Sequence, residues 1–194
     1  MRVLGIDPGL TRCGFGVVDG GPARSARLVD VGVITSHRDN GIAERLLEIQ
    51  RGLIHVIETH APDMVVIERV FSHNNVSTVM GTAQVSGLAL VLAAERRIPV
   101  DMHTPSEVKL AITGNGRADK AQVQAMVQKL LVLDAPPRPA DAADALAIAI
   151  TQLWRGVGTV KLDAGGGART SAQTRWAEAE RAARRAKEQS TSRW

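Results

Sequence analysis

The order of apolar segments along the chain constrains the fold more than any other feature. Three short strand-like segments come first, and only turn residues such as Asp7-Pro8-Gly9 and Asp19-Gly20-Gly21 separate them. Such short connections predict an antiparallel meander. Helix and strand patterns then alternate, which predicts strands joined by helical crossovers. We expect strands at residues 3–6, 13–18, 27–35, 64–67 and 98–102, and helices at 41–60, 76–96, 105–113, 119–133 and 140–154.

The connection between the third and fourth strands determines how the two halves of the sheet join. Apolar residues recur at helical spacing over residues 41–60. A helix that links two strands of one sheet makes a right-handed crossover, which allows the fourth strand to lie parallel to the first. The predicted fold is therefore α/β, with a five-stranded mixed sheet in which three antiparallel strands are followed by two parallel strands, flanked by helices.

A change in composition near residue 155 divides the chain. Residues 163–168 read Asp-Ala-Gly-Gly-Gly-Ala, which predicts a flexible linker. Residues 168–194 contain seven basic and three acidic residues, whereas residues 1–167 contain 17 of each. We therefore expect one domain over residues 1–155 and a flexible basic tail over residues 156–194, part of which has the composition of a helix. An anion bound by the domain must be held by local charge rather than by bulk charge.

Cysteine and aromatic content narrow the environment and the possible binding modes. Cys13 is the single cysteine, so no internal disulfide can form, and this usage is typical of a reducing compartment. No leader-like apolar stretch follows Met1, and the uncharged segment 70–94 is too polar to span a membrane. We therefore expect a cytoplasmic protein with no membrane partner. Two Phe, three Trp and no Tyr argue against a broad aromatic platform for stacking RNA bases.

Two apolar strands end in a carboxylate. Val-Leu-Gly-Ile leads into Asp7, and Met-Val-Val-Ile leads into Glu68. If these strands are parallel neighbours, both acids lie at the same edge of the sheet. Either acid alone could simply begin a turn, but two matched strand ends favour a shared site.

A second pair of acids stands on the last predicted helix. Asp141 and Asp144 are three residues apart, so they share one helix face. Acidic residues are also favoured in the first turn of a helix, so this pair is not by itself evidence of a site. Five alanines between residues 142 and 149 would let this helix pack close to a sheet. Close packing could bring the pair against Asp7 and Glu68.

Four converging carboxylates repel one another unless some are protonated or a cation lies among them. A site made only of oxygen ligands selects Mg²⁺ or Mn²⁺ over zinc. The single Cys and the five scattered His show no zinc-ligand spacing. Two hard cations can activate water and stabilise a leaving oxygen, so the acids indicate phosphodiester hydrolysis.

Three separated motifs carry these acids: Gly5-Ile-Asp-Pro-Gly-Leu, Val66-Ile-Glu-Arg-Val-Phe71 and Ala140-Asp-Ala-Ala-Asp-Ala-Leu-Ala. Their order and spacing across residues 1 to about 155 resemble the RuvC-type Holliday-junction resolvases of bacteria. The resemblance implies a ribonuclease-H-like fold and a homodimer with two active sites. It also implies metal-dependent, paired symmetric nicking of four-way DNA junctions in recombination and repair, leaving 5′-phosphate and 3′-hydroxyl ends.

The same resemblance implies the ligands and partners of the site. Asp7, Glu68, Asp141 and Asp144 match the catalytic, metal-binding acids, with two Mg²⁺ ions per site that Mn²⁺ can replace. A branch-migration motor complex is an implied partner. The residues that match or flank DNA-contacting positions are Phe71, Arg69, Lys109, Arg117 and Lys120.

Each DNA-contact prediction has a plainer alternative. Phe71 could be a core residue, but the polar Ser72-His73-Asn74-Asn75 that follows favours a ring that stacks on bases at the junction centre. The two lysines could be ordinary solvated surface. Arg117 follows a glycine-containing turn that can present main-chain amides to phosphates. The basic tail could add non-specific DNA affinity or only solubility.

Three other functions compete with the nuclease hypothesis. Gly5-Ile-Asp-Pro-Gly-Leu-Thr also resembles the first phosphate loop of actin-like sugar kinases, but those need a second lobe that this chain is too short to form. A small ribonuclease-H-like RNA-processing nuclease is disfavoured by the long helix at 76–96. A junction-binding module without catalysis is disfavoured because all four acids are present. The helix at 76–96 is apolar on nearly all sides, so it suits a central buried helix or a dimer interface.

Overall fold

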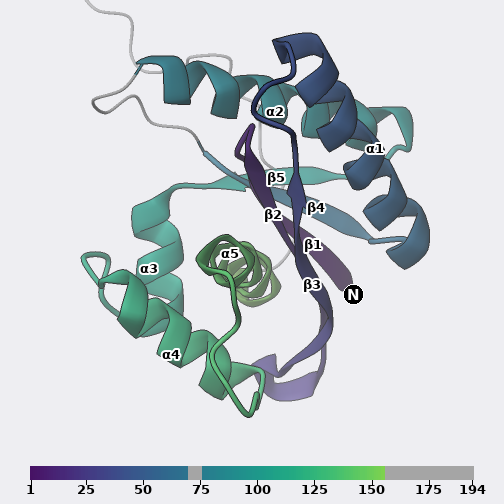
Figure 1. Ribbon diagram of the computed structural model, residues 1–194. Coiled ribbons are helices and arrows are strands. Elements are labelled where there is room, and N and C mark those ends of the chain that lie inside the picture. Colours follow the sequence, from purple (N-terminus) through teal and green to yellow (C-terminus); the bar gives the residue numbers. More distant parts are fainter. Residues whose placement is uncertain (70–75, 156–194) are drawn as a thin grey trace, which may run out of the picture. The chain divides into compact units, whose positions relative to one another are not determined.

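A mixed five-stranded sheet forms the centre of the computed structural model, which describes residues 1–69 and 76–155 (Figure 1). The strands lie in the order β3-β2-β1-β4-β5. β1, β2 and β3 pair antiparallel, whereas β4 pairs parallel with β1 and β5 pairs parallel with β4. The predicted sheet is confirmed. Its strands are β1 (Arg2–Asp7), β2 (Arg12–Gly20), β3 (Ala26–Thr35), β4 (Met64–Glu68) and β5 (Val100–His103).

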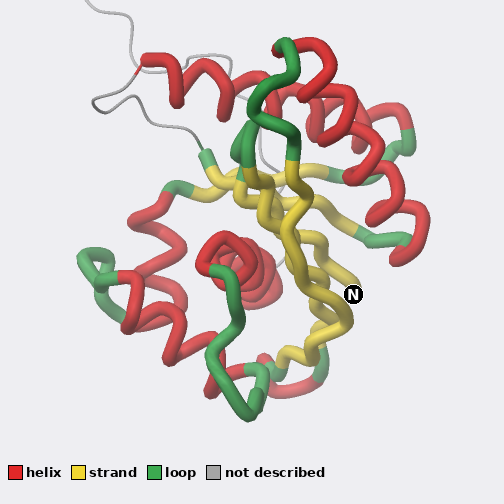
Figure 2. The backbone as a smooth tube through the Cα atoms, viewed as in Figure 1, coloured by secondary structure: helices red, strands yellow, loops and turns green. Residues whose placement is uncertain are grey.

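Helices cover both faces of this sheet (Figure 2). One face packs against α1 (Ile42–His60) and α2 (Val76–Glu95), and the other against α3 (Pro105–Thr113), α4 (Lys120–Leu130) and α5 (Ala140–Arg155). No helix in the described ranges is long and apolar enough to cross a membrane.

Two local features differ from the predicted elements. The helix expected at residues 119–133 is shorter, because Asp119 caps its start by accepting a hydrogen bond from the Gln122 amide, and Leu131 and Val132 leave helical geometry at its end. A short 3₁₀ turn, η1 (Pro22–Arg24), lies between β2 and β3 and was not expected. Residues 70–75 and the predicted tail at 156–194 lie outside the described residues.

Alternation along the strands assigns each side chain to one face. In β1, Val3 packs in the cluster that includes α5, whereas Leu4 and Ile6 pack in the cluster that includes α1 and α2. Because successive side chains point to opposite faces, Asp7 must share the α5 face with Val3. The same argument applies to β4, where Val66 lies on the α5 face and Glu68 follows two residues later.

Glycines under α5 let this helix lie directly on the sheet. A Cβ at Gly5 would stand 2.2 Å from the carbonyl oxygen of Ala145, and one at Gly14 would stand 2.1 Å from that of Asp141. A Cβ at Gly16 would meet the side chain of Leu146 at 2.8 Å. These are backbone or core contacts, so no side chain larger than hydrogen fits without moving the helix.

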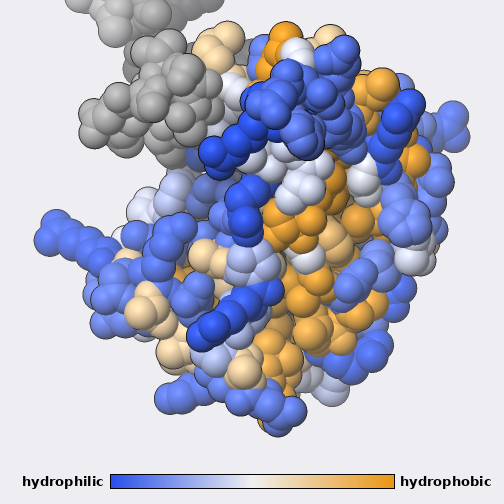
Figure 3. Space-filling view, viewed as in Figure 1, coloured by the Kyte–Doolittle hydropathy of each residue, from blue (hydrophilic) through white to orange (hydrophobic). Residues whose placement is uncertain are grey.

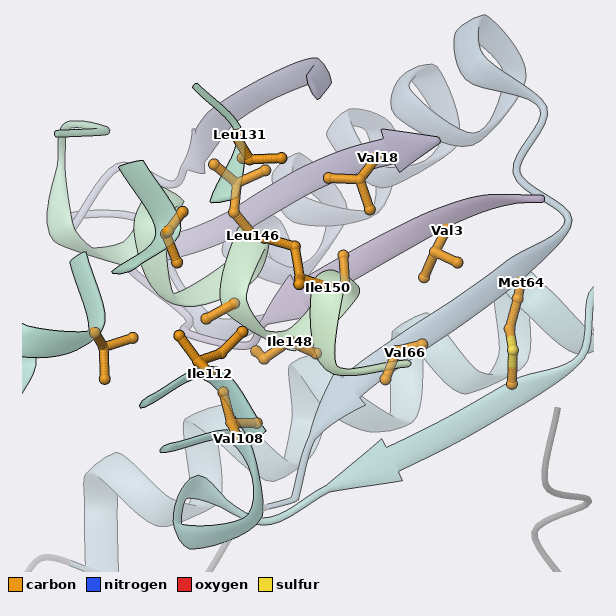
Figure 4. Packing of buried hydrophobic residues seen from close by; sticks show 14 of the residues in the cluster. Val3, Val18, Met64, Val66, Val108, Ile112, Leu131, Leu146, Ile148 and Ile150 are labelled. Atoms are coloured by element: carbon orange, nitrogen blue, oxygen red, sulfur yellow. The ribbon is translucent and has the colours of Figure 1, made fainter. Parts of the chain in front are cut away.

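The contact between α5 and the sheet is also the main apolar core of this face. Ala142, Ala143 and every residue from Ala145 to Gln152 are buried. Burial of each large aliphatic side chain contributes roughly 1.5–3 kcal/mol. Figure 4 shows the residues that interlock here, with Leu146, Ile148 and Ile150 of α5 beside Val3, Val18, Met64 and Val66 of the sheet and Val108 and Ile112 of α3.

The edge of the sheet formed by β3 is less covered by helices than its centre. β3 is an edge strand, and eight of its ten residues are neither fully buried nor exposed. Figure 3 shows apolar surface over this edge, bordered by hydrophilic side chains. Val17 pairs with Asp30 and Val18 with Leu28, so β3 itself carries a bulge at Val29, and bulges are one device that protects sheet edges from unwanted pairing.

We predict that Gly14→Ala destabilises the protein, because the new Cβ would press on the backbone of α5. The expected loss is about 1–3 kcal/mol in the free energy of unfolding, as for other overpacked cores. Gly116→Ala is the control, since a Cβ there meets nothing closer than 3.4 Å. Denaturant unfolding of both variants measures the effect, and equal stability of Gly14→Ala and wild type would contradict the close approach.

Candidate active site

The parallel pairing of β1 with β4 brings the first two predicted acids together. Ile6 pairs with Ile67 in this ladder, so the next residues, Asp7 and Glu68, leave the sheet side by side. Both point to the α5 face by strand alternation. Each is partly buried, and each strand before it is fully buried over at least its last three residues.

The close approach of α5 adds the second pair of acids. A cavity of about 290 Å³ is lined by Asp7, Glu68 and Asp144, together with Lys109 and Lys120. Asp141 does not line this cavity, but its charge is close enough to raise the pKa of Asp7. The structure therefore brings Asp7, Glu68 and Asp144 to one cavity and places Asp141 at its margin.

Two basic side chains bind the acids of α5. Arg12 Nε donates to Asp141 Oδ2 at 2.6 Å, and Lys120 Nζ donates to Asp144 Oδ2 at 3.0 Å. The hydrogen bond and charge of Asp144 raise the pKa of Lys120 above its usual value. These contacts leave Asp7 and Glu68 without an ion-pair partner in the described chain.

Burial and mutual repulsion raise the pKa values of the two strand-end acids, Asp7 and Glu68. Desolvation, followed by the charges of Glu68, Asp144 and Asp141, raises the pKa of Asp7 to about 7. Desolvation and then the charge of Asp144 also raise the pKa of Glu68. Each shift means that the ionised carboxylate is less stable in the folded protein than in water. A bound cation would reverse this penalty.

The chemistry of the donor set fits a hard cation. The cavity offers carboxylate oxygens from three elements and no sulfur or imidazole ligand among its described lining residues, which is the donor set that Mg²⁺ and Mn²⁺ prefer. Within residues 1–69 and 76–155, however, no three acidic, His or Cys side chains already stand close enough to share one ion. Asp141 and Asp144 are instead turned toward Arg12 and Lys120, so metal binding requires these side chains to re-orient.

Only some of the predicted DNA-contacting residues line the acidic cavity. Lys109 and Lys120 line the same cavity as Asp7. Arg69 is exposed directly after Glu68, and its amide donates to the carbonyl of His103 at 2.8 Å. Arg117 is exposed in the turn between α3 and α4 and does not line the cavity. Phe71 lies outside the described residues.

Arg12 is a site residue that the sequence motifs do not single out. It begins β2 and shares the α5 face with Gly14, which explains how it reaches Asp141, 129 residues away. The sequence offers one indirect signal for Arg12. A charged residue at the start of a strand that packs against an acidic helix needs an ion-pair partner. The register of α5 on β2, which decides that partner, has no signal in the sequence.

The sheet order and the carboxylate cavity at its end fit a metal-dependent nuclease of the ribonuclease-H-like class. A family model described as "Crossover junction endodeoxyribonuclease RuvC" matches residues 3–152, and the chain belongs to this family. This membership decides against the sugar-kinase and RNA-processing alternatives.

Individual proteins show the same similarity. The chain is 62% identical to a RuvC protein of Nocardioides sp. over 164 residues, covering 84% of this chain and 93% of that protein. It is 55% identical to one of Renibacterium salmoninarum, covering 98% of each. A structure of Thermus thermophilus RuvC in complex with Holliday junction substrate aligns with a TM-score of 0.74 at 37% identity, covering 78% of this chain and 92% of that chain.

We predict that Asp7→Asn stabilises the metal-free protein at neutral and higher pH. Because the pKa of Asp7 is about 7 in the folded protein against an ordinary value of 3.8, the folded protein binds more protons than the unfolded chain between these values, and stability falls as pH rises through that window. The advantage of the variant should therefore grow from about pH 4 to about pH 7 and then stay constant. Thermal melts in EDTA measure it.

Asp19→Asn is the control with the opposite sign. Hydrogen bonds from Arg2 lower the pKa of Asp19 despite some desolvation, with Arg27 adding to the effect, so the ionised form stabilises the fold above its usual pKa. This variant should lose stability at neutral pH and lose less in acid. A melting temperature of Asp7→Asn that does not vary with pH relative to wild type would contradict the burial of Asp7.

Proposed function

We propose that this chain resolves four-way (Holliday) DNA junctions by paired symmetric nicks, in homologous recombination and DNA repair. The observation that carries the proposal is the convergence of Asp7, Glu68 and Asp144 at one cavity in a chain that belongs to the RuvC family. Hydrolysis leaves 5′-phosphate and 3′-hydroxyl ends. The single buried Cys13 accords with action in the cytoplasm, where the chromosomal DNA of bacteria lies.

The acids are proposed as the catalytic, metal-binding residues. Asp7, Glu68 and Asp144 would hold Mg²⁺, or Mn²⁺ in its place, with Asp141 as the fourth ligand of a two-ion site. When bound, such ions activate water and stabilise the leaving oxygen of the phosphodiester. The protein contributes rigidity, because two ligands end buried strands and two stand on a helix that is packed directly on those strands.

Basic residues around the cavity are proposed to hold the DNA. Lys109 and Lys120 line the cavity itself, so they can neutralise the phosphate that is cut. Arg69 and Arg117, both exposed, are proposed to contact flanking phosphates. We propose that Phe71 stacks on a base at the junction centre, as aromatic side chains do with unpaired bases.

A homodimer is proposed, because two symmetric cuts require two active sites. α2 supports it with two exposed apolar side chains on one helix face, Met80 at 56% and Val91 at 54% exposure. A Cβ at Gly87, between them, would meet nothing within 4 Å. The motor complex that drives branch migration is proposed as a further partner on the strength of the family alone.

We predict that Asp7→Asn, Glu68→Gln and Asp144→Asn each reduce junction cleavage by more than roughly 100-fold, beyond the 10–100-fold loss typical of outer-shell partners of a metal. Junction binding should persist, because basic residues supply most of the affinity. Asp39→Asn, a side chain that is 91% exposed, is the control with full activity. Nicking and gel-shift assays on one synthetic junction, with linear duplex as a comparison, measure both quantities.

An active Glu68→Gln protein would remove the proposed site. Loss of binding in all three variants would instead mean that the acids act through folding or that the substrate is different.

We predict that Val91→Glu weakens the dimer, because it places a charge in an interface that excludes water. Sedimentation at micromolar concentration should show wild type at about twice the chain mass of 20.7 kDa and the variant shifted toward that mass. Ile42→Glu, which replaces an apolar side chain that is 47% exposed on α1, should remain dimeric. A dimer that survives Val91→Glu unchanged would place the interface elsewhere.

A further inference from the structure

A second cavity lies beside the β1–β2 turn and is not part of the acidic cavity. Its volume is about 360 Å³, and it is lined by turn residues 9–12, by Arg45 of α1, and by Gly81 and Thr82 of α2. The turn begins directly after Asp7, so its residues separate the two cavities along the chain. Among the described residues, no acidic side chain lines the second cavity, in contrast to the first.

Arg45 is held in this cavity by neutral groups. Its Nε donates to Ser36 Oγ at 3.0 Å, and its Nη2 donates to Thr11 Oγ1 at 2.7 Å. Ser36 is itself fixed, because its hydroxyl donates to the carbonyl of Leu10 and its amide donates to the carbonyl of Thr11. The guanidinium is therefore oriented before any ligand binds.

The charge of Arg45 is not balanced by the part of the chain that the structure describes. No ion pair joins Arg45 to an acid in residues 1–69 or 76–155, and the side chain is half-buried. A partly desolvated cation without a counter-ion is costly. An anion in the adjacent cavity would supply the missing partner.

Arg12 connects this cavity to the acids. It lines the cavity, while its Nε donates to Asp141 Oδ2. Its side chain is 47% exposed, which leaves its terminal nitrogens accessible to a second acceptor. Arg45 and Arg12, from different elements, thus both line one cavity, and the planar guanidinium of an arginine suits a phosphate group.

We propose that this second cavity binds a backbone phosphodiester of the DNA strand that is cut, close to the scissile phosphate, with Arg45 as its principal contact and Arg12 as the second. The proposal rests on the proposed function, because it assumes that DNA enters the acidic cavity. A phosphate bound in the second cavity would hold the DNA strand on the side of the β1–β2 turn away from the acidic cavity. This contact would set where the DNA strand lies relative to the acids.

Binding to a junction that carries one neutral methylphosphonate tests this proposal. The neutral linkage is moved one position at a time on either side of the cut, and affinity is measured with the uncleaving Asp7→Asn protein and with the same protein carrying Arg45→Gln. At one position, neutralisation should weaken binding roughly tenfold, equal to about 1.4 kcal/mol, for the protein that retains Arg45. The same change should have little effect on the Arg45→Gln protein.

Two further measurements separate direct contact from a structural role. Arg45→Gln should lower the slope of log affinity against log salt by about 0.9, as expected for one lost phosphate contact, and Arg45→Lys should recover part of the affinity. Arg51→Gln, which removes an exposed charge from the same helix, is the matched control. Because it retains Arg45, its binding should weaken as much as that of the parent protein when the methylphosphonate is at the one position that Arg45 contacts.

Methylphosphonate losses that are equal at every position, whether or not the protein carries Arg45→Gln, would overturn the subsite. Failure of the uncleaving protein to bind the junction at all would overturn the proposed function instead.

Discussion

Direct packing of α5 on the glycines of β1 and β2 is the contact on which the rest of the structure depends. Gly5 and Gly14 let the helix backbone approach the strands so closely that a Cβ would overlap its carbonyl oxygens. This approach buries almost the whole helix and brings Asp144 to the strand ends. The alanines of α5 and the glycines of the sheet thus act together, because both are needed for the close contact. This contact joins residues from the two ends of the domain.

Close packing also concentrates negative charge. Asp7 and Glu68 emerge from buried strands, and the acids of α5 add to their repulsion, so the pKa of Asp7 rises to about 7. Arg12 and Lys120 offset part of this charge through Asp141 and Asp144. The remaining negative charge is what would favour a cation bound among these acids, as proposed. The proposed function of Asp7 therefore opposes the stability of the fold, as often happens at functional sites.

The sheet and the strand-end acids were predictable because short-range patterns determine them. Alternation in β1 and β4 assigns Asp7 and Glu68 to one face, and the single helical crossover makes their strands parallel. The partners of Asp141 and Asp144 were not predictable, because they depend on the rotation and register of α5 over β2. Lys120 illustrates the difference: the family resemblance implies a DNA contact for it, which remains a prediction, but nothing in the sequence indicates its bond to Asp144.

Other sequence inferences remain predictions. The stacking role of Phe71 and the nature of the basic tail concern residues outside the described ranges. Arg45 had no motif to mark it, since an arginine in an amphipathic helix normally faces solvent. Its significance emerges only when the turn after Asp7 folds back and places Thr11 beside it.

The location of a bound Mn²⁺ ion tests the central claim most directly. Anomalous diffraction from crystals of the protein grown with Mn²⁺ would place the ion without reference to any activity. We expect a peak ligated by Asp7 of β1 together with a carboxylate of α5, with Asp144 turned away from Lys120. A peak that lacks any ligand from α5, or an ion bound outside this cavity, would contradict the account in which helix packing on the glycine face assembles the site.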